Sequence, residues 1–255
     1  MIELRNLTKR YGSLTAVNDL SLTVPKGELF CFLGPNGAGK TTTIKVLTGL
    51  VRPTSGTARV AGFDVQSESL QAKRLIGYIP DMPYLYERLT ATEYFDFIAD
   101  LYGVPEPSAA ESLERMFALF GLNEYRATLV KDLSHGYRQR LIYATTLLHD
   151  PQVLFVDEPL IGLDPRTIRL IKDLLIQRAR AGMTIFLTTH ILALAEDIAD
   201  RIGIILHGRL IALGTLAEIR ALHGARNLES IFLALTADGP EDKAISMGLN
   251  GNGSR

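Results

Sequence analysis

Residues 29–41 read Leu-Phe-Cys-Phe-Leu-Gly-Pro-Asn-Gly-Ala-Gly-Lys-Thr, an apolar run followed by a glycine-rich segment. The run from Leu29 to Leu33 predicts a strand that is buried on both faces, as in a parallel sheet. From Gly34 the chain matches the pattern G-x-x-x-x-G-K-[ST], whose glycines let backbone N–H groups converge on phosphate oxygens. A helix expected from about Lys40 to Leu50 points its positive N-terminus at the same anion. The stretch therefore predicts an α/β fold with a nucleotide phosphate site.

The residues expected to bind the nucleotide form one continuous segment across the loop and the start of the helix. Lys40 adds a point charge near the outer phosphates, and the Thr41 hydroxyl is a candidate ligand of Mg²⁺. A glycine turn that precedes Lys-Thr by chance is the alternative, but here the loop also follows a buried strand and opens a helix. The candidate nucleotide-binding residues of this segment are Gly34, Pro35, Asn36, Gly37, Ala38, Gly39, Lys40, Thr41 and Thr42.

A second apolar run, from Val153 to Val156, ends in the adjacent carboxylates Asp157 and Glu158. Ligands of open α/β sheets gather at the carboxyl ends of the strands. Because neighbouring side chains on a strand point in different directions, the two acids are expected to have different roles. Asp157 is predicted to hold Mg²⁺ through water, and Glu158 to polarise an attacking water as general base. The alternative is an acidic turn before Pro159, which the phosphate loop upstream makes the weaker interpretation.

The N-terminal segment alternates between apolar and polar residues, which predicts half-buried strands. One such strand passes through Ile2, Leu4 and Leu7, and the other runs from Leu20 to Val24. The pattern differs from that of the continuous apolar strands, which are expected to be buried on both faces.

From about residue 83 to residue 150 the pattern is helical and no strand interrupts it. Thr90-x-x-Glu93 and Ser108-x-x-Glu111 both have capping-box spacing, so each is expected to begin a helix. A third helix is expected from about Ser134 to Leu148. These helices predict a helical subdomain inserted into the α/β unit.

The sheet pattern returns after the acidic pair. Asp164-Pro165 predicts an N-cap followed by proline in the first helical position, and this helix ends near Gly182. Thr184 to Thr188 predicts another buried strand. Further on, His207-Gly208 lies between two apolar runs and is typical of a two-residue hairpin turn.

The composition excludes several classes of protein. Of the 255 residues, 47% are hydrophobic and 22% are charged, which argues against disorder, collagen and coiled coil. The formal net charge of -1 gives no overall field for nucleic acid or an anionic membrane. The single cysteine, Cys31, excludes an intrachain disulfide, and without a secretory signal the cytosol is the expected compartment. No run of 18 apolar residues occurs, so the chain is not expected to span a membrane.

The segment from Leu133 to Arg140, Leu-Ser-His-Gly-Tyr-Arg-Gln-Arg, resembles the signature L-S-G-G-Q-x-Q-R of the ATP-binding cassette (ABC) family. Taken alone, L-S-x-G is a common helix cap, but its place shortly before the acidic strand favours the signature. The resemblance covers the chain from about Ile2 to Ala237. In the family, the signature of one subunit closes on the γ-phosphate held by the other. It implies an across-dimer set of Leu133, Ser134, His135, Gly136, Tyr137 and Gln139.

Three further positions match the family in order along the chain. Tyr11 is implied to stack on adenine, although alone it reads as a turn tyrosine. Leu163 and Asp164 resemble the D-loop that crosses the dimer interface, which is compatible with a helix cap. His190 resembles the switch histidine that contacts the γ-phosphate and orients the general base, whereas a lone histidine at a strand end is usually a polar surface residue.

The sequence departs from the family pattern at a metal position and in the signature. Family members usually carry Gln where this chain has Asp81, so we expect Asp81 to keep a metal role, directly or through water, and to change coupling to the partner. His135 and Tyr137 replace the usual Gly and Gln. Ser134 and Gly136, the anion-contacting positions, are retained, so closure around ATP is expected to survive.

The resemblance implies a fold and a domain organisation. The fold is a P-loop NTPase (RecA-like) core with an N-terminal antiparallel β subdomain and an inserted α-helical subdomain at about 83–150. One nucleotide-binding domain would span residues 1–238, and residues 239–255, rich in Gly, Asn and Ser, are expected to be a mobile tail.

The implied function is an ATP- and Mg²⁺-dependent ATPase that powers a membrane-spanning permease on a separate chain. It would pair with a second cassette, either another copy or a paralogue, at the cytoplasmic face of the cell membrane. Tyr84, Leu85, Tyr86 and Leu89, near Asp81, are expected either to dock the permease or to pack in the core. The C-terminal segments are similar to those of ABC-2 exporters, which favours export.

Three other functions fit the sequence less well. A cassette ATPase acting on ribosomes or DNA would usually carry a second cassette, a basic linker or a long insertion, and no nucleic-acid partner is expected at a net charge of -1. A cassette that only binds ATP is disfavoured because Glu158 and His190 are both present. A GTPase is disfavoured because no Asn-Lys-x-Asp segment occurs.

Overall fold

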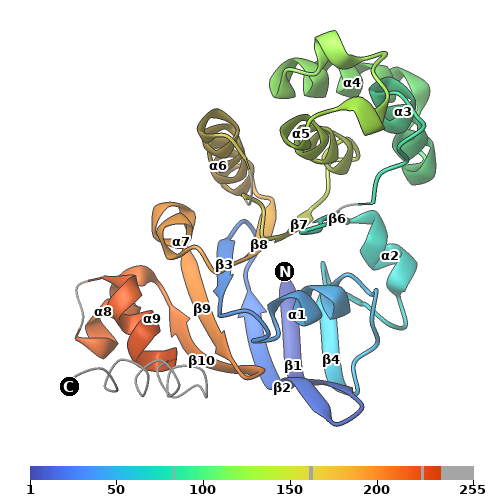
Figure 1. Cartoon of the computed structure of the whole chain (residues 1–255). Coiled ribbons are helices and arrows are strands. Elements are labelled where there is room, and N and C mark those ends of the chain that lie inside the picture. The colour runs from blue at the N-terminus through green and yellow to red at the C-terminus, as the bar shows by residue number, and fades with distance from the viewer. Residues whose placement is uncertain (83, 161–162, 225–226, 237–255) are drawn as a thin grey trace, which may run out of the picture.

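The apolar run before the phosphate loop is a central strand of the larger of two sheets. The computed structural model describes residues 1–82, 84–160, 163–224 and 227–236 (Figure 1). Within these residues the larger sheet has the strand order β10-β9-β3-β8-β7-β6. All its pairs are parallel except the edge hairpin of β9 and β10. The strands are β3 (Leu29–Leu33), β6 (Ile76–Ile79), β7 (Val153–Asp157), β8 (Thr184–Thr189), β9 (Arg201–Leu206) and β10 (Arg209–Gly214).

The N-terminal strands form the predicted antiparallel sheet, in the order β2-β1-β4-β5. Its register shifts between Leu4 and Leu7, and Asn6 between them has a φ of 47°. This bulge explains why the buried residues are three apart there instead of two, since one extra residue returns Leu7 to the core face. The strands are β1 (Ile2–Tyr11), β2 (Leu14–Val24), β4 (Ser55–Val60) and β5 (Phe63–Asp64), of which the last two were not predicted.

The inserted helical subdomain lies between β6 and β7 and stands beyond one edge of the larger sheet (Figure 1). It contains α3 (Ala91–Tyr102), α4 (Glu106–Phe120), η1 (Asn123–Tyr125), η2 (Val130–Asp132) and α5 (His135–Thr146). Thr90 and Glu93 form the predicted capping box. The predicted cap at Ser108 is wrong, because α4 already begins at Glu106. Pro107 fits the first helical turn, because an N–H group at this position would have no acceptor within the helix.

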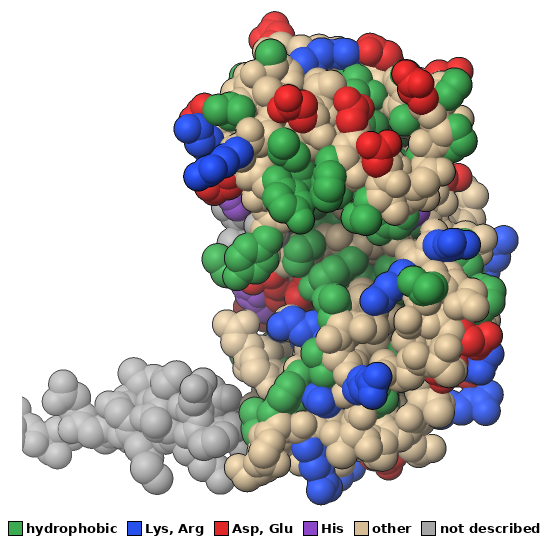
Figure 2. Space-filling model, turned by 90° about the vertical axis from the view of Figure 1, so that its right-hand side faces the viewer, with side chains coloured by type: hydrophobic (Ala, Val, Ile, Leu, Met, Phe, Trp, Pro, Cys, Tyr) green, Lys and Arg blue, Asp and Glu red, His purple; other side chains and the backbone are tan. Residues whose placement is uncertain are grey.

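The face where the helical subdomain meets the sheet carries exposed apolar side chains. Figure 2 shows hydrophobic side chains gathered across the middle of this face, between the helical subdomain above and the core below. Exposed Leu50, Tyr84 and Leu101 line one groove with Tyr94, and the exposed ring of Tyr86 contacts Tyr94 and Phe97. A patch of this kind on a globular protein indicates an interaction surface.

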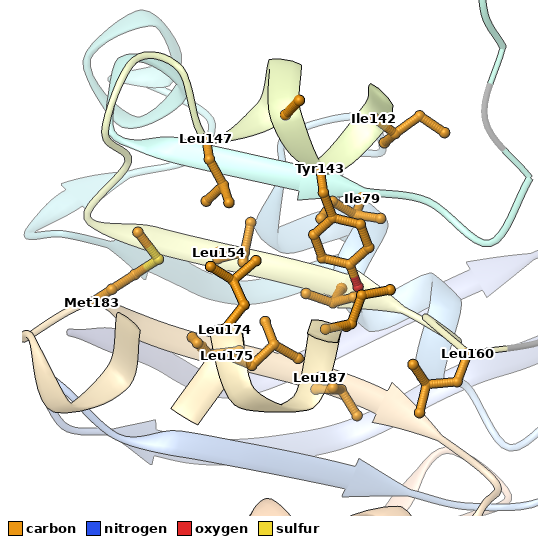
Figure 3. Close-up of a cluster of buried hydrophobic side chains, with 14 of the residues drawn as sticks. Ile79, Ile142, Tyr143, Leu147, Leu154, Leu160, Leu174, Leu175, Met183 and Leu187 are labelled. Atoms are coloured by element: carbon orange, nitrogen blue, oxygen red, sulfur yellow. The ribbon is translucent and has the colours of Figure 1, made fainter. Parts of the chain in front are cut away.

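Strand β3 contributes side chains to two separate hydrophobic clusters. Leu29, Cys31 and Leu33 belong to the cluster shared with α3 to α7, part of which is shown in Figure 3. Phe30 and Phe32 belong to the cluster shared with α1 (Lys40–Leu47) and the antiparallel sheet. Each fully buried side chain of this size contributes about 1.5–3 kcal/mol. The loop that follows β3 is therefore anchored from both faces of the sheet.

Besides α1, which follows the phosphate loop, the other helices of the described residues follow β5, β7, β8 and β10 in the chain. They are α2 (Ser69–Arg74), α6 (Pro165–Arg180), α7 (Leu192–Ile198), α8 (Leu216–His223) and α9 (Leu228–Thr236). The predicted hairpin turn is confirmed, with φ of 48° at His207 and 75° at Gly208. No helix in the described ranges is both long and apolar enough to cross a bilayer. The tail predicted at 239–255 lies outside the described residues.

Candidate functional site

The glycine-rich loop between β3 and α1 can be built only with glycine at two of its positions. A Cβ on Gly34 would lie 2.5 Å from the carbonyl oxygen of Ile205, and one on Gly39 would lie 2.4 Å from that of Ala16. Gly39 also has a φ of 110°, which side chains rarely adopt. Backbone from two other elements therefore presses the loop into its curled shape.

Lys40 lies inside this loop and carries its charge toward the acidic strand end. Its side chain is 7% exposed, and Nζ donates hydrogen bonds to the carbonyl oxygens of Gly34 (2.7 Å) and Pro35 (3.2 Å). The same Nζ lies 3.4 Å from Oε1 of Glu158. A buried cation with three oxygen neighbours is placed where an anionic phosphate would be attracted.

Asp157 is a buried carboxylate, 1% exposed, at the end of β7. Its Oδ1 accepts hydrogen bonds from the hydroxyls of Thr41 (3.3 Å) and Thr188. Burial raises the pKa of Asp157, the two hydrogen bonds oppose this shift, and the charges of Glu158 and Asp81 add to it. No Lys, Arg or His among the described residues forms an ion pair with Asp157, so this buried carboxylate beside Thr41 favours the approach of a cation.

The oxygen donors around Asp157 suit Mg²⁺, which needs few protein ligands, better than a metal ion whose ligands all come from the protein. Among the described residues, no group of three or more His, Cys, Asp or Glu side chains is arranged to hold a metal ion. Mg²⁺ usually takes one or two protein oxygens and completes its shell with water and substrate phosphates. Thr41 and Asp157 match that donor set, and Asp81 and Thr41 line one cavity.

Glu158 follows Asp157 but points to different partners, as the alternation predicted. Its Oε2 lies 3.0 Å from Nδ1 of His190, and its Oε1 faces Lys40. Its φ of 49° is unusual for a residue other than glycine, and its N–H donates to the carbonyl oxygen of Thr188. Strained backbone of this kind occurs where a side chain must be aimed, which identifies Glu158 as a candidate functional residue.

The predicted residues from four parts of the chain line one cavity of about 290 Å³. The lining comprises Tyr11, Leu14, Ala16, Pro35, Asn36, Gly37, Ala38, Gly39, Lys40, Thr41, Thr42, Asp81 and Glu158. Two predicted residues contact the lining without being part of it. The carbonyl oxygen of Gly34 accepts from Lys40, and His190 contacts Glu158. Tyr11 is 45% exposed, with Nζ of Lys9 4.8 Å from its ring centroid. The cavity thus combines a phosphate loop, an aromatic ring and the two carboxylates of Asp81 and Glu158, and the buried Asp157 reaches it through Thr41.

The signature segment lies away from this cavity in the same chain. Leu133 and Gln139 are buried, whereas Ser134 and His135 are exposed. The Ser134 hydroxyl caps α5 by accepting from the N–H of Tyr137 (3.4 Å). The segment can therefore offer Ser134, His135 and the Gly136 backbone to a partner, but not the side chains of Leu133 or Gln139.

The predicted helix cap at Asp164 is present at the start of α6. Its Oδ1 accepts from the N–H groups of Arg166 (3.0 Å) and Thr167 (3.1 Å). Hydrogen bonds from Thr167, first its hydroxyl and then its N–H, hold the pKa of Asp164 below its usual range. Leu163 is half-buried beside it.

Some residues of the site were not predicted from the sequence. Thr188 binds Asp157, and Leu14 and Ala16 line the cavity. The one available signal was the pair of hydroxyls that ends the otherwise apolar strand β8. Leu14 and Ala16 carry no chemical signature, because they contribute only their position on β2.

Comparison with known proteins places the chain in a family. The family model described as ABC transporter matches residues 17–161. The chain is 39% identical over 221 residues to the probable multidrug ABC transporter ATP-binding protein YbhF of Escherichia coli, covering 87% of this chain and 38% of the relative. It therefore spans well under half of that protein.

Two other relatives are covered more fully. The daunorubicin/doxorubicin resistance ATP-binding protein DrrA of Streptomyces peucetius is 42% identical over 89% of this chain and 69% of its own. The lantibiotic transport ATP-binding protein SrtF of Streptococcus pyogenes is 36% identical over 91% of this chain and 96% of its own.

Solved structures agree with the fold. The ATP-binding subunit of an ABC transporter superposes with a TM-score of 0.87 at 32% identity, over 92% of this chain and 99% of that one. The dimeric cassette MJ0796 shares the fold, with a TM-score of 0.78 at 24% identity over 85% of this chain and 99% of that one. The predicted P-loop NTPase core with its antiparallel subdomain is confirmed, and the chain belongs to the ATP-binding cassette family of ABC transporters.

Proposed function

We propose that this chain hydrolyses ATP and so powers a separate membrane-spanning permease, at the cytoplasmic face of the membrane. The observation that carries the proposal is the position of Glu158, between Lys40 of the phosphate loop and His190. Names of relatives that refer to drug resistance and lantibiotic transport support export over import.

The cavity residues divide the work of binding ATP. The loop N–H groups and Lys40 bind the phosphates, and Tyr11 stacks on adenine. Thr41 and Asp157, with Asp81 directly or through water, hold Mg²⁺. When bound, Mg²⁺ neutralises charge on the phosphates as the γ-phosphoryl group is transferred. The buried, weakly compensated carboxylate of Asp157 supports this assignment.

Glu158 acts as the general base. It accepts a proton from water as the water oxygen bonds to the γ-phosphorus and the bond from that phosphorus to the ADP oxygen breaks. His190 holds the carboxylate through the 3.0 Å contact. In the proposed mechanism it also contacts the γ-phosphate. Lys40 keeps Glu158 close to the phosphate loop.

A second cassette, another copy or a paralogue, completes each site. The cavity contains no signature residue of its own chain, while Ser134 and His135 are exposed elsewhere. In the proposed dimer, Ser134 and the Gly136 backbone contact the partner's γ-phosphate, and Leu163 and Asp164 cross the interface. A helix N-terminus at α5 adds a favourable dipole for that anion.

The permease docks on the apolar face between the helical subdomain and the core. A groove of about 440 Å³ lies there, lined by residues that include Tyr78, Tyr84, Leu85 and Tyr94. Tyr84 is 97% exposed and Tyr86 59%, whereas Leu85 and Leu89 pack against the core. In this proposal Tyr84 and Tyr86 dock the permease, while Leu85 and Leu89 contribute to core packing. Acidic side chains border the patch above and basic ones below (Figure 2).

Glu158→Gln tests the central assignment. The variant keeps the size of the side chain but cannot take the proton, so hydrolysis should fall by about 100-fold or more while ATP still binds. ATP should then trap a closed dimer, visible by size-exclusion chromatography. A dimer formed by this chain alone identifies a homodimer, and one that needs a related chain identifies a paralogue.

The matched control is Glu124→Gln, a substitution of an exposed glutamate in the helical subdomain. It should hydrolyse ATP at the wild-type rate. If Glu158→Gln also does so, Glu158 is not the base and the proposed mechanism is wrong.

A further inference from the structure

Arg140, in the middle of α5, connects the signature helix to the start of α6. Its Nε (3.1 Å) and Nη2 (2.6 Å) donate to the hydroxyl of Thr167, a fully buried residue. Nη2 also lies 3.7 Å from Oδ2 of Asp164, and Nη1 donates to the carbonyl oxygen of Phe120 (3.3 Å). One guanidinium therefore holds together α4, α5 and the cap of α6.

Tyr137 covers the face of that guanidinium. The carbon of the Arg140 guanidinium lies 5.0 Å from the centroid of the Tyr137 ring, within the range of a cation–π interaction. Tyr137 also packs against Tyr125 at a centroid distance of 4.0 Å. The ring thus confines Arg140 from a direction in which the guanidinium has no hydrogen-bonding atom.

The same network brings two dimer-facing segments close together within one chain. A Cβ built on Gly136 would lie 3.9 Å from Oδ2 of Asp164. Gly136 belongs to the signature, and Asp164 caps α6 through the N–H of Thr167 and that of Arg166. A shift of Arg140 would therefore move the signature and the α6 cap relative to each other.

We infer that Tyr137 is a positioning residue that clamps Arg140 and makes the signature segment and the D-loop of one chain a single rigid unit. The inference rests on the proposed function for its consequence, because both segments face the partner's ATP. A glutamine at this position, which the family usually carries, has no aromatic ring to offer Arg140. The clamp is thus a property of the tyrosine in this sequence.

The clamp itself is tested in the monomer by amide hydrogen exchange. Tyr137→Gln should raise the exchange rates of the Arg166 and Thr167 amides by about tenfold, because the cap of α6 loosens. The middle of α6 should exchange at its wild-type rate. Tyr137→Phe, which keeps the ring, should restore protection at both amides. Unchanged exchange in Tyr137→Gln, or equal loosening in both variants, would overturn the inference.

The consequence for the dimer is tested in a Glu158→Gln background. Tyr137→Gln should raise the ATP concentration that gives half-maximal dimerisation by about tenfold, while ATP affinity of the dilute monomer stays the same. In an Arg140→Lys background, Tyr137→Gln should add less than about twofold, because the planar guanidinium is already lost.

The two failures can be told apart. A parent Glu158→Gln chain that binds no ATP or never dimerises argues against the proposed function, and the exchange experiment still decides the clamp. A parent that dimerises, with a Tyr137→Gln variant that needs no more ATP or loses monomer affinity equally, overturns the positioning role.

Discussion

Asp157 illustrates, at the scale of a single residue, how a binding site opposes stability. Its carboxylate is almost fully buried and has two threonine hydroxyls as its hydrogen-bonding partners. Burial raises its pKa, which means that the folded protein holds the charged form at a cost. A bound cation would remove that cost, so the residue is suited to the bound state of the protein.

Asp157→Asn should therefore stabilise the protein without nucleotide or metal by about 1 kcal/mol, while hydrolysis is lost. The amide is neutral and its oxygen can still accept from Thr41 and Thr188. Because the folded pKa of Asp157 is raised, its destabilising effect is present above that pKa and fades as the pH falls toward the ordinary carboxyl range. The stability advantage should shrink over that window in urea unfolding experiments.

The exposed Asp132 provides the control for this measurement. Asp132→Asn should change the free energy of unfolding by less than about 0.5 kcal/mol. A destabilised Asp157→Asn protein at neutral pH would contradict the account of Asp157 as a weakly compensated charge.

Asp81→Gln tests the departure from the family pattern. Asp81 lines the nucleotide cavity, and its negative charge should attract Mg²⁺ more strongly than an amide does. The variant should need roughly tenfold more Mg²⁺ for half-maximal hydrolysis. Asp81→Asn removes the charge but keeps the length of the side chain, so it separates the effect of charge from the effect of length. Equal rates and equal Mg²⁺ dependence in wild type and Asp81→Gln would reject a metal role.

Sequence reasoning at this scale succeeded where the signal is contiguous. The phosphate loop and the acidic pair are short patterns, and the structure places Glu158 in the cavity of the loop and Asp157 within hydrogen-bonding distance of Thr41. Thr188 was missed because it meets Asp157 only through the pairing of β7 with β8. Arg140 belongs to the signature segment. Its contacts with Thr167 and Asp164 could not be predicted, because they depend on how α5 packs beside α6.

At the scale of elements, two identical spacings had different outcomes. Thr90-x-x-Glu93 caps α3, but Ser108-x-x-Glu111 lies inside α4. The spacing alone does not decide, because Pro107 lets the second helix begin before its serine. The short strands β4 and β5 were missed for a related reason, since most of their residues are only partly buried or exposed and show weak alternation.

The contact of β6 with α5 sets the position of the helical subdomain and depends on Gly77. A Cβ there would lie 2.9 Å from Cγ2 of Thr146 and 3.0 Å from atoms of both Leu154 and Pro151. Gly77→Ala should therefore destabilise the protein by about 1–3 kcal/mol through overpacking. Thermal unfolding measures the loss.

Thr146→Ala offers a rescue for this substitution, because it removes the nearest clashing methyl group. The double variant should recover part of the stability lost in Gly77→Ala. An unchanged melting temperature for Gly77→Ala alone would show that α5 shifts freely and does not rest on β6.

At the scale of the whole molecule, β3 is one of several strands of the larger sheet that contribute side chains to both hydrophobic clusters. One cluster contains the helical subdomain and the other contains the antiparallel sheet, and both take side chains from this strand. The burial of β3 on both faces could be predicted, since every residue of the run is apolar. Which face meets which cluster could not, because the strand order places β3 between β9 and β8, far apart in the sequence.

The position of β3 also gives the protein a built-in chemical reporter. Cys31 is the only cysteine, the chain has no tryptophan, and burial raises the pKa of the thiol, which keeps it unreactive in the folded state. Labelling by a thiol reagent should therefore occur only when the sheet opens. ATP at ten times its dissociation constant should slow labelling about elevenfold, as for any ligand specific to the folded state. A labelling rate indifferent to saturating ATP would instead reveal an opening of the sheet that leaves the nucleotide loop intact.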